Sequence, residues 1–116
     1  MTKLFHREVF MPETLLNQIV GKEVKFSFSH HAKSECRNDR YGFIIPPTSV
    51  KVEASKVVEL ESTDGKVSKV VYRQALDAQR DIVLVFLPDG FVKTLWINLA
   101  SDNHRTLNKG AFSKNL

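Results

Sequence analysis

The 116-residue sequence has one cysteine, one tryptophan, five glycines and four prolines, and it has no long apolar run. Cys36 alone can form neither a disulfide framework nor a cysteine-rich zinc cluster. No stretch approaches the roughly 20 apolar residues of a transmembrane helix, and the N-terminus lacks the apolar core of a signal peptide. We therefore expect a cytoplasmic protein without membrane contact.

Motifs for cofactors and metals are scarce as well. The sequence contains no Gly-rich phosphate loop, no nucleophile elbow and no Cys/His spacing typical of a metal site. His30, His31 and His104 could bind a metal together with Asp39 or Asp102, but their spacing singles out no site. We therefore expect no cofactor and no metal.

The length and charge of the chain set broad limits. Residues 1–116 are predicted to form one domain, because this length buries roughly two thirds of the unfolded surface without metals or disulfides. Residues 1–10 could form an arm or an edge strand, and residues 108–116 are predicted to be a flexible tail. Seventeen Lys and Arg against thirteen Asp and Glu give a net charge of +4, which is compatible with a polyanionic partner.

Two hairpins are predicted in the second half of the chain. Residues 82–87 (IVLVFL) are apolar on both faces and too short for a typical helix, so they predict a strand buried on both sides. The turn signal Pro-Asp-Gly at 88–90 leads into residues 91–98, which are β-branched and aromatic. An Asp-Gly signal likewise joins residues 56–61 to residues 67–73, where charged residues alternate with apolar ones and predict one solvent-exposed side.

Alternation along residues 91–98 assigns side chains to two faces of the sheet. Phe91, Lys93, Leu95 and Ile97 are predicted on the core face, and Val92, Thr94, Trp96 and Asn98 on the other. The second set could line a cleft. Alternatively, Trp96 simply packs and its N–H bonds to the backbone, as is usual for a buried Trp.

The N-terminal half predicts two helices around one strand. Residues 12–20 show apolar residues at one-turn spacing and are predicted to be a short amphipathic helix. Residues 23–28 alternate like a strand, and Ser29 is positioned to cap a polar helix over residues 29–40. On that helix Cys36 is expected to be a small buried filler and not a nucleophile. The order of these elements, which ends with four strands in two hairpins, predicts an α+β fold with an antiparallel or mixed sheet.

One constellation of side chains suits RNA chemistry. Cleavage of RNA without a metal needs a general base, a general acid and cations that stabilise the charged phosphorane. The candidate residues on the polar helix and around the last strand are His31, Lys33, Arg37, Arg40, Thr94, Trp96, Asn98, His104 and Arg105. The alternative is that the charge-rich helix is only a solvated surface.

Part of the sequence resembles known families. Residues 28–32 (FSHHA) and then Arg40-Tyr41-Gly42 resemble the opening motif of small bacterial and phage domains of the "domain of unknown function 4258" type. These are similar to RelE-like and colicin D-like nucleases, which pack a helix or two on a four-stranded antiparallel sheet. The resemblance therefore implies one or two N-terminal helices packed on a roughly four-stranded, mainly antiparallel sheet. Thr94-Leu95-Trp96 resembles the Ser-x-Trp strand that faces a His in colicin D. Residues 92–98 and 102–107 are also similar to small phage proteins.

Two hypotheses of function follow from the residues and the resemblance. The first is a small metal-independent ribonuclease-like or RNA-binding protein. Its catalytic residues would be His31, Lys33, His104 and Thr94, and its substrate-binding residues Arg37, Arg40, Trp96, Asn98 and Arg105.

The second hypothesis is a non-catalytic, phage-encoded protein that binds and modulates a host protein or nucleic acid. The expected partners are RNA, a host protein or an acidic antitoxin-like protein. A homodimer is a further alternative, and a phage protein would act in the host cytoplasm.

Overall fold

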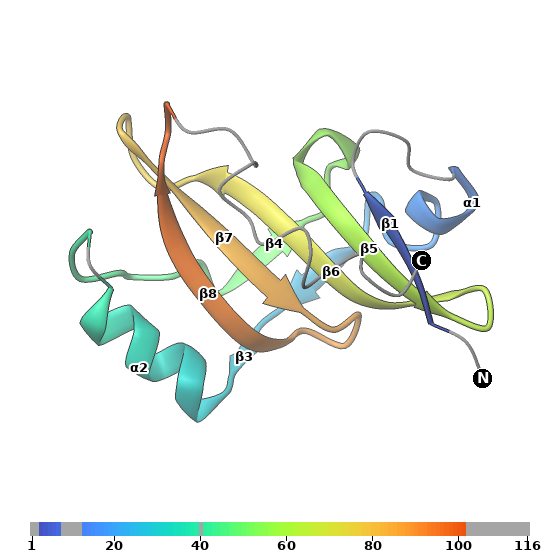
Figure 1. Ribbon diagram of the computed structural model, residues 1–116, viewed down its shortest axis with the longest axis horizontal. Coiled ribbons are helices and arrows are strands. Elements are labelled where there is room, and N and C mark those ends of the chain that lie inside the picture. The colour runs from blue at the N-terminus through green and yellow to red at the C-terminus, as the bar shows by residue number, and fades with distance from the viewer. Residues whose placement is uncertain (1–2, 8–12, 40, 102–116) are drawn as a thin grey trace.

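The computed structural model describes residues 3–7 (backbone only), 13–39 and 41–101 of the chain. It confirms the predicted α+β class and the predominance of antiparallel pairing (Figure 1). In chain order the elements are β1 Lys3–Arg7, α1 Glu13–Leu16, β2 Glu23–Lys25, β3 Ser27–Phe28, α2 His30–Asn38, β4 Ser49–Lys51, the 3-10 turn η1 Ala54–Lys56, β5 Val57–Thr63, β6 Lys66–Ala75, β7 Arg80–Phe86 and β8 Phe91–Leu99.

The main sheet has six strands in the order β1-β5-β6-β7-β8-β3. All neighbours in it are antiparallel except β3 and β8, which are parallel. The prediction of roughly four strands was therefore too low. Residues 3–7 take the edge-strand alternative of the two considered for the N-terminus, and β3 adds a strand at the opposite edge.

Both predicted hairpins are confirmed. The β7–β8 connection turns at Gly90, whose φ is 99°, and the β5–β6 connection turns at Asp64 and Gly65, with φ of 54° and 78°. These backbone angles are the ones that Gly, Asn and Asp tolerate best, which is why the local signals were reliable.

The N-terminal elements are shorter and more divided than predicted. The expected helix over residues 12–20 is only the four-residue α1, followed by turns. The expected strand over residues 23–28 is split between two sheets. The Phe26 N–H donates to the Thr48 carbonyl beside the β2–β4 pair, at 2.8 Å, whereas the Ser27 N–H donates to the Gly90 carbonyl next to β8, at 3.0 Å. A long-range switch of partner thus breaks one alternating run into two strands.

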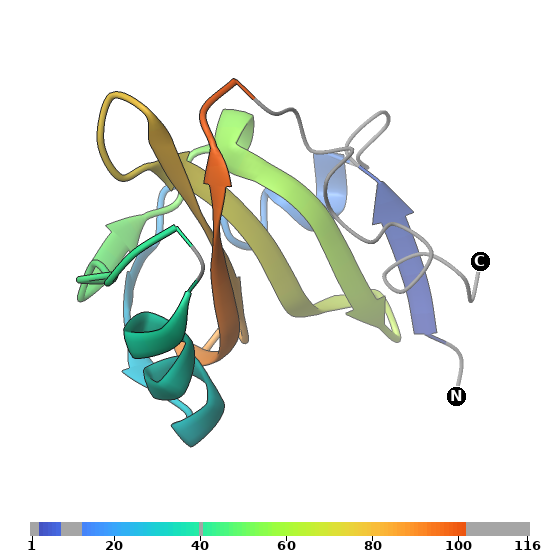
Figure 2. The same ribbon diagram turned by 60° about the vertical axis from the view of Figure 1, so that its left-hand side comes forward.

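The core lies on one face of the main sheet. Leu15 of α1, Val24 of β2 and Ala32 of α2 share a single buried cluster with sheet residues such as Leu84 and Leu95. α1, α2 and the β2–β4 pair therefore all cover this face, which we call the core face. Both views show α2 beside β8, at the end of the sheet away from β1 (Figures 1 and 2).

A β-bulge in β8 changes the predicted faces. Val85 pairs with Thr94 but Phe86 pairs with Val92, so Lys93 is an extra residue in the ladder. Val92 is therefore fully buried on the core face with Leu95, whereas Phe91 is 38% exposed. The alternation predicted for residues 91–93 was wrong, because a bulge reverses the side-chain period. Beyond the bulge the predicted alternation holds.

Gly90 offers a test of the packing of the β7–β8 turn against the end of β2. A Cβ at Gly90 would overlap the carbonyl oxygen of Lys25, and the φ of 99° is unfavourable for other residues. At Gly65 the φ is 78° but nothing lies within 4 Å of an added Cβ. We expect Gly65→Ala to cost about 1 kcal/mol through backbone strain alone, and Gly90→Ala more than about 3 kcal/mol.

Chemical denaturation of the two variants beside the wild type measures this difference. Equal losses at both positions would contradict the close approach of residue 90 to residue 25.

Candidate functional site

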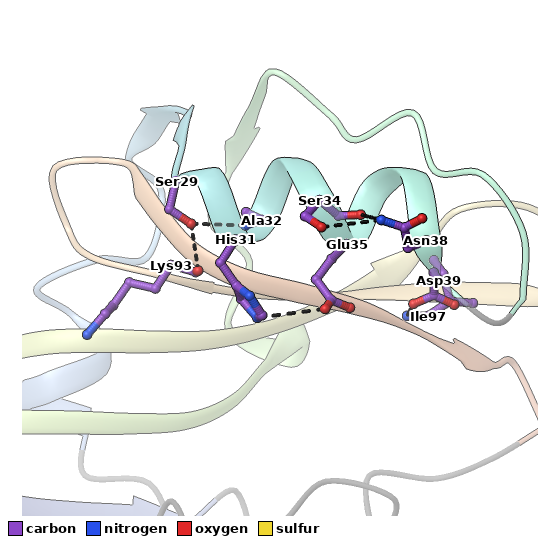
Figure 3. A network of polar contacts seen from close by, with 9 residues as sticks. All are labelled: Ser29, His31, Ala32, Ser34, Glu35, Asn38, Asp39, Lys93 and Ile97. Carbon is purple, nitrogen blue, oxygen red and sulfur yellow. Dashed lines mark hydrogen bonds and ion pairs between the residues drawn. The ribbon is translucent and has the colours of Figure 1, made fainter.

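The helix that carries the candidate residues His31, Lys33 and Arg37 is attached to the edge of β8 at both ends (Figure 3). The Ser29 hydroxyl accepts a hydrogen bond from the Ala32 N–H at 3.0 Å, as predicted for an N-cap, and donates one to the Lys93 carbonyl at 2.8 Å. At the other end, the Asp39 carboxylate accepts from the Ile97 N–H at 3.1 Å. These contacts cover polar backbone groups at a strand edge and fix the rotation of α2 about its axis.

His31 lies on an exposed side of α2. Its side chain is 65% exposed, and its Nε2 is 3.7 Å from Glu35 Oε1 one turn later (Figure 3). That separation is too long for a hydrogen bond, so the carboxylate does not hold the imidazole in one orientation. Within the described residues His31 has no other polar side-chain partner. Its role as a general base stays a prediction.

Lys33 and Arg37 lie on the opposite flank of α2 from His31. Each residue turns an α-helix by about 100°, so positions two apart are separated by about 200°. Lys33 and Arg37, by contrast, are one turn apart and share a flank, which lines a groove that His31 does not line. The structure therefore separates the predicted pair of His31 and Lys33.

The face of β8 that carries Thr94, Trp96 and Asn98 is not an open cleft. Trp96 packs against a small buried cluster formed by Val58, Val71, Val83 and Val85 on the face opposite the core. Asn98, on the same side, is buried, and Thr94 is half-buried. The alternative in which Trp96 packs is the one observed. Arg40, His104 and Arg105 lie outside the described residues, so their predicted roles stay predictions.

Sequence reasoning missed the charges on this second face. Residues 56–61 and 67–73 were expected to present a solvent-exposed side, yet Glu59 and Glu61 are only 3% and 7% exposed. Lys69 Nζ lies 3.2 Å from Glu61 Oε2, and Arg73 Nε lies 2.8 Å from Asp81 Oδ2. Each of these two pairs sets a cation beside a carboxylate on a largely buried part of the sheet surface.

An apolar groove lies between α2 and the extended segment 43–46. It has a volume of about 340 Å³ and is lined by Phe28, Lys33, Cys36, Arg37, Phe43, Ile44, Ile45 and Pro46. The Ile44 N–H donates to the Cys36 carbonyl at 2.8 Å, and the Ile44 side chain is buried. Since an extended chain alternates, the flanking Phe43 and Ile45 are 64% and 77% exposed. We call this surface the α2 groove.

Two cations border the α2 groove. Lys33 and Arg37 are exposed, and neither side chain forms an ion pair with a carboxylate in the part of the chain that the structure describes. Glu35 instead contacts His31, and Asp39 accepts the backbone bonds of Ile97 and Tyr41. The rim of the groove is therefore positively charged while its floor is apolar. The sequence signal was present, since residues 43–45 are apolar and precede two prolines, but no cleft was predicted from it.

The thiol at the floor of the groove is protonated at neutral pH. Burial raises the pKa of Cys36 above its ordinary value; the nearby Arg37 charge lowers it, and the Asp39 and Glu35 charges raise it again. Since the thiolate is the reactive form, Cys36 is a poor nucleophile. The side chain is half-buried and lines the groove, so the prediction of a buried filler is met only in part.

No other chemistry is evident in the residues that the structure describes. Among them, no group of three His, Cys, Asp or Glu side chains could hold a metal ion. No helix in these residues has the length and apolar character needed to cross a bilayer.

The raised pKa of Cys36 predicts slow alkylation. Iodoacetamide should modify the native protein more slowly than the urea-unfolded protein at the same pH, and the rate should rise at higher pH in the native state. Because the chain has one cysteine, the unfolded protein is an internal control. A thiol pKa in the native protein that is equal to or lower than the thiol pKa in the unfolded protein would contradict the burial of this thiol.

Comparison with known proteins adds no family to this geometry. No protein-family model, no curated protein and no solved structure matches the chain. The resemblance to RelE-like and colicin D-like nucleases stays a prediction that rests on the quoted motifs. Function is therefore argued from the surface of the molecule.

Proposed function

We propose that this protein is a non-catalytic binding protein that engages a partner protein through the α2 groove. The observation that carries the proposal is the exposure of Phe43 and Ile45 beside two cations, Lys33 and Arg37, that are unpaired within the described residues. Exposed apolar groups that gather at a hollow with a polar rim are typical of interaction sites. Aromatic residues and Arg are also the types enriched at the centres of protein interfaces.

The arrangement of the described candidate residues favours binding over catalysis. A ribonuclease needs its base, acid and phosphate-binding cations around one substrate position. Here α2 places His31 on one flank and Lys33 on the other, and Trp96 lies against buried valines. His31 and Lys33 are therefore not positioned to act together on one substrate.

The lining of the groove favours a protein over RNA as the partner. Proteins that bind single-stranded RNA combine several aromatic platforms with cations that follow the backbone. The α2 groove has one well-exposed aromatic residue, Phe43, and its other apolar lining residues include Ile44, Ile45 and Pro46. An aliphatic hollow of this kind suits an apolar side chain better than a base.

Site-specific crosslinking tests the proposed function. A photo-reactive amino acid at Ile45 should give a discrete, protease-sensitive and ribonuclease-resistant adduct in cells that express the protein. The same group at Val20, which is 37% exposed and does not line the groove, is the matched control. A ribonuclease-sensitive adduct, or the same adducts from both positions, would overturn the proposal.

An RNA cleavage assay addresses the rival function. Pure protein incubated with total RNA and tRNA in EDTA should leave the RNA intact, because His31 and Lys33 do not face one site. Wild type and His31→Ala should behave alike. Discrete fragments from the wild type that are absent with His31→Ala would establish catalysis and sink the binding proposal.

A further inference from the structure

The chemistry of the α2 groove points to the kind of segment that fills it. We infer that the occupant is a short acidic segment of a partner protein, with one large apolar side chain that enters the groove. Carboxylates of the same segment would pair with Lys33 and Arg37. This inference rests on the proposed function and adds the chemical class of the partner.

The floor of the groove fits a single apolar anchor. Phe28 and Cys36 are half-buried, Ile44 is buried, and all three line a hollow of about 340 Å³. Phe43 and Ile45 are exposed beside it and would lose contact with water when it is filled. Burial of their apolar surface, together with that of the anchor, would supply the main driving force.

The rim of the groove fits carboxylates at a defined spacing. Lys33 and Arg37 share one flank of α2, so their Cβ atoms are about 6 Å apart. Alternate residues of an extended peptide lie about 6.7 Å apart on one side, which is nearly the same distance. Two acidic residues separated by one position would therefore meet both cations. Of the carboxylates nearest in the chain, Glu35 lies toward His31 on the other flank of α2, and Asp39 accepts hydrogen bonds from backbone N–H groups.

Cys36 provides a reporter for occupancy of the groove. It is the single cysteine of the chain, and it lines the α2 groove beside Arg37. A bound apolar side chain would cover the thiol and slow its alkylation. The readout is local to the groove and requires no added label.

Peptide display tests the inference with a defined probe. Random 12-residue peptides displayed on phage are selected on the wild-type protein, and enriched sequences are synthesised for fluorescence anisotropy. We expect acidic residues near one Leu, Ile, Met or Phe, and protection of Cys36 from iodoacetamide. Reversing both rim charges in Lys33→Glu with Arg37→Glu should weaken binding at least about tenfold.

Two control variants separate the outcomes. Lys22→Glu with Lys93→Glu makes the same change in net charge at exposed positions that do not line the groove, and it should leave affinity unchanged. Phe43→Ser with Ile45→Ser removes the exposed walls and should abolish binding, with thermal melting used to verify the fold of each variant.

The results then distinguish the two proposals. Peptides that need Phe43 and Ile45 but lack acidic residues, or bind the rim variant as well as the wild type, would overturn the acidic partner and leave the proposed function standing. Affinity that falls equally in both charge variants would likewise overturn it. If the selection yields no peptide whose binding depends on Phe43 and Ile45, that result would count against the groove as a binding surface. It would then count against both the acidic partner and the proposed function.

Discussion

The attachment of α2 to the edge of β8 determines which side chains the helix exposes and which it buries. Ser29 bonds to the Lys93 carbonyl at one end of the helix, and Asp39 bonds to the Ile97 N–H at the other. The helix therefore lies along the open edge of β8 and is fixed to it at both ends. A strand edge left open would invite pairing with another chain. Since both ends are fixed, α2 can present only one set of residues inward, and Ala32 is fully buried there.

That fixed rotation decides which side chains act together. With Ala32 facing the core, His31 and Glu35 fall on one flank, and Lys33 and Arg37 fall on the other. The same two contacts position the carbonyl of Cys36. This carbonyl accepts a hydrogen bond from the Ile44 N–H and so holds segment 43–46 alongside the helix. The α2 groove and the separation of the catalytic candidates thus share one cause.

Local chemistry made part of this structure predictable from sequence. The turns at Gly65 and Gly90 and the cap at Ser29 depend on a few adjacent residues, and all three were predicted. The pairing of β3 with β8, the bulge at Lys93 and the division of residues 23–28 depend on partners far along the chain. For the same reason Lys33 and Arg37 were selected by residue type, but neither the groove beside them nor their separation from His31 was predicted. The rotation of α2 is set by contacts across more than 50 positions of sequence.

The charged residues of the second face have a structural explanation. Glu61 and Lys69 are direct partners across β5 and β6, and Arg73 reaches Asp81 across β6 and β7. A slip of one residue in either pairing would turn these charges into the core face, where burial without partners is costly. Because β7 is buried on both faces from Ile82 to Phe86, apolar pattern alone would specify its register weakly. The ion pairs supply that specification, so the polar pattern along these strands serves the fold.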